Sequence, residues 1–170
     1  MTTMASKGTA KVTLPTDEQI LITREFDAPR HLVYTAWTTP EPVKRWWSGG
    51  RGEVTTCDID LRVGGTWRFV MLAHGEFEVA FHGEYLEIVP NERLVSTEVY
   101  EGAPPLPAED VPVNTVTFAE AGGRTTLELL TQTTSKQLRD MIIDSGMEAG
   151  MQDGMDLLEQ LAISLGDDGA

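Results

Sequence analysis

A histidine and a glutamate stand two positions apart in a stretch that alternates like a β-strand. His82 and Glu84 point to the same face of that strand, because side chains two apart share a side. An imidazole beside a carboxyl group can move protons in a cyclisation or a dehydration, so the pair is a candidate for general acid and base catalysis. Two polar residues on one face equally mark the solvent side of a sheet. Both interpretations stay open at the level of the sequence.

Other reactive residue types do not fall into spacings that build a catalytic or metal site. The histidines His31, His74 and His82 and the single cysteine, Cys57, match neither a CxxC nor an HExxH pattern. Cys57 could act as a nucleophile only with a histidine brought across the sheet. The glycine-rich run at 49–52 lacks the strand before it and the helix after it that a phosphate loop needs. We therefore expect no metal and no cofactor.

Glycines and methionines form two adjacent rows in the last long stretch of the chain. The rows are Gly146, Gly150 and Gly154 beside Met147, Met151 and Met155. A spacing of four places each row along one side of a helix. Since a glycine inside a helix costs about 1 kcal/mol relative to alanine, the glycine row needs a compensating role. Close packing of the helix on a sheet is one such role, and space left for a ligand is the other.

Aromatic residues alternate along two expected strands and can line the same space as these rows. The two stripes are Trp67, Phe69 and Met71 on one strand and Phe77, Val79 and Phe81 on the next. Of the adjacent Trp46 and Trp47, one can be buried while the other sits at a cavity mouth or a partner surface. Plain core packing is the alternative for each of these residues. The candidate ligand-binding residues are Trp47, Trp67, Phe69, Met71, Phe81, Met147, Gly150 and Met151.

These residues must be positioned by a long helix and a series of hairpins. The periodicity predicts a helix over 135–165, capped by Ser135 and broken or kinked at Gly146. Two short helices, over about 27–37 and 39–47, are expected to follow a first strand. The predicted strands are 18–26, 54–61, 66–72, 76–89, 94–100, 113–118 and 125–133, with turns at 64–65, 74–75, 90–92 and 122–123. Because the alternation slips within the long strand, we also predict a β-bulge at Gly83.

The order of these elements predicts an α+β fold in which a curved, seven-stranded antiparallel sheet wraps around the C-terminal helix. A chain of 170 residues fits one domain. We place that domain at 18–165, with a flexible N-terminal tail over 1–17 and a flexible C-terminus over 166–170. A bent sheet cannot follow a straight helix along its whole length, so an apolar space between them is the expected ligand site.

The charge of the chain argues against two classes of partner. Its 27 acidic and 13 basic residues give a net charge of −14, which repels nucleic acid phosphates and anionic membrane surfaces. No apolar run reaches the roughly 18 residues of a membrane span, and the first residues lack the apolar core of a signal peptide. A lone thiol agrees with a reducing compartment. We therefore expect a cytoplasmic protein that binds neither nucleic acid nor membrane.

Several motifs, taken in order, resemble one family. They are PheAspAlaPro at 26–29, TrpThrThrProGlu at 37–41, TrpTrp at 46–47, AspLeuArgValGlyGlyThrTrpArgPhe at 60–69 and SerGlyMetGluAlaGly at 145–150. The chain is similar to the family related to the C-terminal domain of the activator of the heat shock protein 90 ATPase, within the START-like or SRPBCC superfamily. The resemblance covers about residues 18–165 and implies a helix-grip fold. It supplies no general catalytic motif, so no residue role is carried over from it.

The resemblance also implies a choice among functions. Relatives bind lipids, hormones or polyketides, some are aromatase/cyclases, and the eukaryotic activator is a co-chaperone. Our first hypothesis is a carrier or sensor that binds a small hydrophobic molecule of unknown identity between the C-terminal helix and the sheet. The alternatives are a co-chaperone-like adaptor with a protein partner and an aromatase/cyclase-like enzyme that uses the same pocket.

Overall fold

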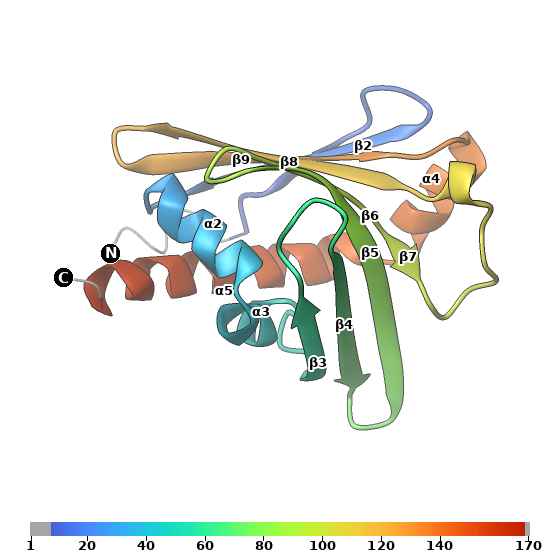
Figure 1. The fold of residues 1–170 in the computed structure, drawn as a ribbon, viewed down its shortest axis with the longest axis horizontal. Coiled ribbons are helices and arrows are strands. Elements are labelled where there is room, and N and C mark those ends of the chain that lie inside the picture. Colours follow the sequence, from blue (N-terminus) through green and yellow to red (C-terminus); the bar gives the residue numbers. More distant parts are fainter. Residues whose placement is uncertain (1–7, 169–170) are drawn as a thin grey trace.

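The computed structural model describes residues 8–168 as an antiparallel sheet curved around a long helix (Figure 1). The strands are β1 (Lys11–Thr13), β2 (Gln19–Phe26), β3 (Gly52–Ile59), β4 (Thr66–Ala73), β5 (Phe77–Val89), β6 (Arg93–Thr97), β7 (Val99–Tyr100), β8 (Val113–Ala121) and β9 (Arg124–Gln132). The helices are α2 (Arg30–Thr38), α3 (Pro40–Trp46), α4 (Lys136–Asp144) and α5 (Met147–Asp168), and a short 3-10 helix, η1, spans Ala108–Asp110. The predicted α+β helix-grip architecture is confirmed.

The sheet has nine strands rather than the seven predicted. Its order is β1-β2-β9-β8-β6-β5-β4-β3, with β7 paired to β5, and every pairing is antiparallel. The number rises because β1, of three residues, forms within the predicted tail and because the predicted strand 94–100 is divided into β6 and the two-residue β7. Strands this short show no alternation of their own and form only because a longer neighbour offers free backbone groups.

Both predicted tails contain regular structure where the structure describes them. Lys11–Thr13 pairs with β2, and Ala10 exchanges two hydrogen bonds with the Gln152 side chain, at 3.1 and 2.6 Å. At the other end, α5 continues to Asp168 instead of ending near 165. Helix and strand therefore continue beyond 18–165 on both sides, and the domain bounds stay a prediction. Residues 1–7 and 169–170 lie outside the described part of the chain.

The predicted turns and helix break are confirmed, and the bulge is displaced. Left-handed backbone occurs at Gly64, His74, Gly75, Asn91, Gly122 and Gly123. Gly146 has a φ of 81°, which ends α4 before α5 begins, and the Ser135 side chain caps α4 by accepting from Leu138 N at 3.1 Å. The register of β5 against β6 shifts between Tyr85 and Glu87, beyond the predicted Gly83. The bulge falls where β5 changes partner, because β5 pairs with β4 up to Glu84 and with β6 afterwards.

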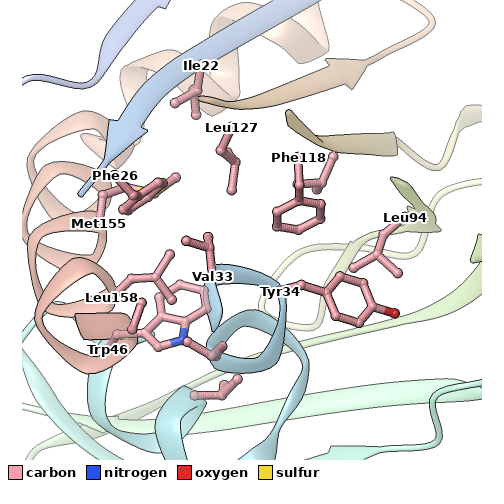
Figure 2. Close-up of a cluster of buried hydrophobic side chains, with 14 of the residues drawn as sticks. Ile22, Phe26, Val33, Tyr34, Trp46, Leu94, Phe118, Leu127, Met155 and Leu158 are labelled. Carbon is pink, nitrogen blue, oxygen red and sulfur yellow. The ribbon is translucent and has the colours of Figure 1, made fainter. Parts of the chain in front are cut away.

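One half of the concave face, the side of the sheet toward α5, is filled by a closed core. In Figure 1, α2 and α3 lie on the same side of the sheet as α5, with β2, β8 and β9 above the helix. Figure 2 shows Val33 and Trp46 from the short helices meeting Leu127 from the sheet and Leu158 from α5. Each is at most 8% exposed, and burying such a side chain contributes about 1.5–3 kcal/mol. This core fixes the C-terminal part of α5 against β2, β8 and β9.

A buried ion network also ties α5 to β2. Arg24, fully buried, donates to Asp156 Oδ1 at 2.8 Å and to Glu159 Oε1 at 3.0 Å. The second oxygen of Glu159 accepts from the backbone N–H of Asp27 at 2.8 Å. Because these charges are paired and hydrogen-bonded, they fix the register of the helix on the sheet.

Candidate functional site

The other half of the concave face is aromatic. Trp67 and Phe69 on β4 alternate with the exposed Arg68, so they point toward the helices, and Phe81 on β5 lies opposite Phe69. Trp47, directly after α3, contacts both phenylalanines, with ring centroids 5.4 Å from Phe69 and 5.8 Å from Phe81. Trp67 contacts Phe69 at 4.9 Å, and Tyr100 contacts Phe81 at 5.1 Å. We call Trp47, Trp67, Phe69, Phe81 and Tyr100 the aromatic cluster.

The adjacent tryptophans divide as the sequence predicted. Trp46 is 8% exposed and donates its indole N–H to Ala36 O at 2.9 Å, so it belongs to the closed core. Trp47 turns to the aromatic cluster and stays partly exposed. Adjacent side chains on a helix point in directions about 100° apart, which sends the two indoles to different halves of the concave face.

The aromatic cluster is only partly covered. Trp67 is buried, but Trp47, Phe69 and Phe81 are intermediate in exposure, and Tyr100 is 47% exposed. Phe77, at the tip of the same stripe on β5, is 54% exposed. An apolar surface on the inner side of a sheet is normally covered by the opposing helix. Here it continues from the core to solvent, which makes it the candidate binding surface.

The three glycines of the helical row have three different environments. Gly146 has left-handed backbone and separates α4 from α5. A methyl carbon at Gly154 would lie 3.0 Å from Trp46 O, so this glycine permits close packing of α5 on α3. A methyl carbon at Gly150 would have no atom within 4 Å apart from its chain neighbours and the backbone of its own helix. Of the two roles that the sequence left open, close packing therefore applies to Gly154 and open space to Gly150.

The remaining predicted ligand residues lie on the same side of the sheet. Met71 shares the inner face of β4 with Phe69 and is partly buried. Met147 and Met151 are partly buried and pack against the edge of the closed core. Direct contact between these methionines and the aromatic cluster stays a prediction.

A row of hydrogen-bonded polar residues on the concave face was not predicted. Asn114 alternates with the buried Val116 and Phe118 along β8, so it points inward. Asn114 Nδ2 donates to Glu98 Oε1 at 3.1 Å, and Thr131 Oγ1 donates to Asn114 Oδ1 at 2.7 Å. We call Glu98, Asn114 and Thr131 the polar row. Burial raises the pKa of Glu98 above its ordinary value, and the hydrogen bond from Asn114 partly offsets this.

The hypothesis that His82 and Glu84 act as an acid and base pair in this site is wrong. His82 and Glu84 are exposed and alternate with Phe81 and Gly83, so they lie on the convex face. His82 Nδ1 lies 2.8 Å from an oxygen of Glu101 instead, and Arg68 forms two bonds with the same carboxylate, at 2.9 and 3.0 Å. The hydrogen bonds from Arg68 and then His82 lower the pKa of Glu101 to about 2. The arrangement is a charged surface cluster on the side away from the helices.

Cys57 has the properties of an inert core thiol. It is 9% exposed, and its cross-strand neighbour is Phe69. Burial raises the pKa of Cys57 to about 11, only partly opposed by the charge of Lys44. A thiol that stays protonated at neutral pH is a poor nucleophile.

Residues 8–168 offer neither a metal-binding cluster nor a helix that could span a membrane. No group of three or more His, Cys, Asp or Glu side chains in this range could hold a metal ion. Within the same range, no helix is both long and apolar enough to cross a membrane. An open hollow of about 440 Å³ runs along the outer side of α4, beside the exposed Met141. Its lining comes from one helix, so we regard it as a surface groove.

Comparisons with known proteins agree with this architecture. A solved structure of a protein from Rhodobacter sphaeroides has a TM-score of 0.81 and 19% identity, covering 92% of this chain and 99% of that one. A protein from Chromobacterium violaceum has a TM-score of 0.73 and 26% identity, with 86% and 98% covered. An AHSA1-like protein from Aeromonas hydrophila has a TM-score of 0.62 and 23% identity, with 86% and 94% covered.

The sequence itself matches a family model. The model is described as "Activator of Hsp90 ATPase homolog 1-like protein" and matches residues 27–162. A comparison with curated proteins gives no significant match. The matched range runs from the end of β2 into the last turns of α5, so it includes both the aromatic cluster and the polar row. The chain belongs to the family of activator of Hsp90 ATPase homologue 1-like proteins, with the START-like fold that its motifs implied.

Proposed function

We propose that the chain is a carrier or sensor that binds a small, largely hydrophobic molecule against the aromatic cluster. The observation that carries the proposal is the incomplete cover of an inward-facing aromatic surface. Phe69 and Phe81 face the same side as the closed core, yet they remain partly exposed. Apolar surface in a concave region binds apolar ligands because its removal from water is favourable, by about 25 cal/mol per Å².

The first turns of α5 supply the opposite wall of the proposed site. The open space at Gly150 leaves room beside the helix backbone. Met147 and Met151 flank it, and the flexible, polarisable methionine side chain adapts to ligands of different shape. With Trp47, Trp67, Phe69, Met71 and Phe81, these residues form the proposed binding surface.

A substitution that fills the space at Gly150 tests this function. Titration with naphthalene, followed by tryptophan fluorescence, should show saturable binding to the natural chain. Gly150→Leu should weaken binding about tenfold or more, because the new side chain occupies the volume that the ligand uses. Ala149→Leu is the matched control, since Ala149 is the adjacent, exposed residue of α5, and it should bind as the natural chain does. No saturable response, or an equal loss in both variants, would refute the proposal.

The adaptor remains a second candidate because of one observation. Phe77 and Tyr100, 54% and 47% exposed, extend the aromatic surface to the rim of the sheet, where a protein partner could cover them. Replacing Phe77 with serine separates the two functions. A carrier should keep its affinity for naphthalene, because Phe77 lies at the tip of the hairpin. The enzyme hypothesis loses its candidate pair, since His82 and Glu84 lie on the convex face.

A further inference from the structure

Trp67 carries a hydrogen-bond donor that has no partner in the described part of the chain. The residue is 8% exposed, and its indole Nε1 is buried. Native structures keep few such donors, because burying an N–H without an acceptor is unfavourable. A methyl carbon at Gly83 would collide with the Thr97 carbonyl and lie 2.6 Å from Nε1, so the indole edge extends from β4 over β5. Gly83 is required here because any side chain would collide with the Thr97 carbonyl and with the indole.

The indole edge lies over Gly83, and strand pairing places Glu98, at one end of the polar row, opposite Gly83. Trp67 pairs with Gly83 across β4 and β5. The flanking pairs are Tyr85 with Ser96 and His82 with Val99, and they place Glu98 opposite Gly83. Since neighbouring strands are about 4.8 Å apart, the Cα atoms of Trp67 and Glu98 are separated by about 10 Å. Nε1 lies over Gly83, between these two residues, and the Glu98 carboxyl group bonds to the inward-pointing Asn114, so both groups lie on the concave side of neighbouring strands.

These two groups define the chemistry of what they can bind together. Trp67 Nε1 requires an acceptor. Glu98 Oε1 is already bonded to Asn114, and within residues 8–168 Oε2 is available to accept a hydrogen bond. A hydroxyl group both accepts and donates, whereas a carboxylate offers no donor to Glu98 and an ammonium group offers no acceptor to Trp67.

We propose that the ligand of the concave face carries a hydroxyl group that accepts from Trp67 Nε1 and donates to Glu98. The proposal rests on the proposed function and adds the polar end of the ligand. The aromatic cluster holds the apolar body, and the polar row orients Glu98 through Asn114 and Thr131. The ligand class is therefore a hydroxylated, largely apolar molecule such as a phenol or an alicyclic alcohol.

Matched probes test the hydroxyl group separately from apolar binding. Naphthalene, 2-naphthol and 2-naphthoate share one ring system and differ at one substituent. We expect 2-naphthol to bind about tenfold more tightly than naphthalene, because the buried Trp67 Nε1 gains its missing partner and Glu98 gains a second one, and 2-naphthoate to bind least. In nitrogen-15 spectra, the Trp67 indole N–H signal should move downfield with 2-naphthol and not with naphthalene. That signal is assigned by its absence in Trp67→Phe.

Variants at the two groups should change the preference for 2-naphthol over naphthalene, measured within each variant. Trp67→Phe should lower the affinity for 2-naphthol to that for naphthalene. The control Trp37→Phe changes an indole outside the aromatic cluster and should keep the preference for 2-naphthol. Glu98→Gln should lower the preference for 2-naphthol and improve binding of 2-naphthoate, because the negative charge is removed. Should Trp67→Phe fail to fold by circular dichroism, Glu98→Gln decides the question.

The outcomes separate this inference from the proposed function. Equal binding of naphthalene and 2-naphthol by the natural chain would contradict the proposal that the ligand carries a hydroxyl group, while the proposed apolar site would remain supported. If neither compound binds, both the proposed apolar site and the proposed hydroxyl group of its ligand are contradicted. An unchanged preference in both Trp67→Phe and Glu98→Gln would also overturn the inference, because the preference would then arise elsewhere.

Discussion

The carboxylate of Glu101 holds Arg68 and His82 together on the convex face. Its pKa of about 2 lies below the ordinary value of 4.5, chiefly through the hydrogen bonds from Arg68. Its contribution to stability is therefore present above about pH 4.5 and is lost as the pH falls toward 2. Arg68→Gln should raise the pKa of Glu101 toward 4.5, as measured by carbon-13 NMR of the carboxyl group. Arg62→Gln, at an arginine paired with Asp60, should leave it unchanged. A pKa near 4.5 in the natural chain would contradict the arrangement.

A residue of the site could be predicted from the sequence when a periodic pattern within its own segment determined its position. It could not be predicted when its position depends on pairing between distant segments. Trp67, Phe69 and Phe81 follow from alternation along two adjacent strands, which the turn after residue 73 brings together. Glu98 and Thr131 are neighbours only because β8 lies between their segments. A signal was present, since Asn114 is polar at an inward position of an alternating strand. Without the strand order, that signal does not identify its partners.

At the scale of the helix, α5 contains two glycines with opposite environments. Gly150→Ala should raise the free energy of unfolding by about 0.5–1 kcal/mol, because the helix gains propensity and the methyl group meets open space. Gly154→Ala should lower it by about 1–3 kcal/mol, because the methyl group would press on Trp46 O at 3.0 Å. Urea denaturation of both variants measures the difference. Equal changes would show that α5 does not pack on α3 as described.

Elements with their own periodicity or turn chemistry were predictable. The long strand β5, the hairpin turns and the break at Gly146 each depend on residues close in sequence. The short strand β1 depends on a partner elsewhere in the sheet and was missed, and the break that divides the predicted strand 94–100 into β6 and β7 was not predicted. The bulge was misplaced for a related reason: the change of partner at Tyr85 sets it, whereas Gly83 is explained by the Thr97 carbonyl and the Trp67 indole, which leave no room for a side chain.

Across the whole molecule, the buried ion network joins the first long strand to the last helix. Glu159→Gln should lower the free energy of unfolding by about 3–5 kcal/mol, because Arg24 would keep only Asp156 as a charged partner. The matched control is Glu87→Gln, which breaks the exposed pair with Arg93 and should cost no more than about 1 kcal/mol. Similar losses in the two variants, measured by denaturation, would contradict a special role for the network.

The molecule as a whole combines a closed half with an open half. The closed core and the ion network anchor the C-terminal part of α5 to the sheet. The fold therefore does not require the first turns of α5 to cover the aromatic cluster completely. The net charge of −14 adds a field that disfavours anionic ligands, in agreement with a neutral hydroxylated molecule at Glu98.

The most direct test of the central claim is to locate a bound apolar molecule by its contacts with methionine methyl groups. In protein labelled with carbon-13 at these methyls, nuclear Overhauser effects from naphthalene should reach Met71, Met147 and Met151, which surround the proposed site. Met155, 3% exposed in the closed core, and Met141, 60% exposed on α4, should show none. Effects confined to Met141, or none at any of these methyls under saturating naphthalene, would contradict binding between α5 and the sheet.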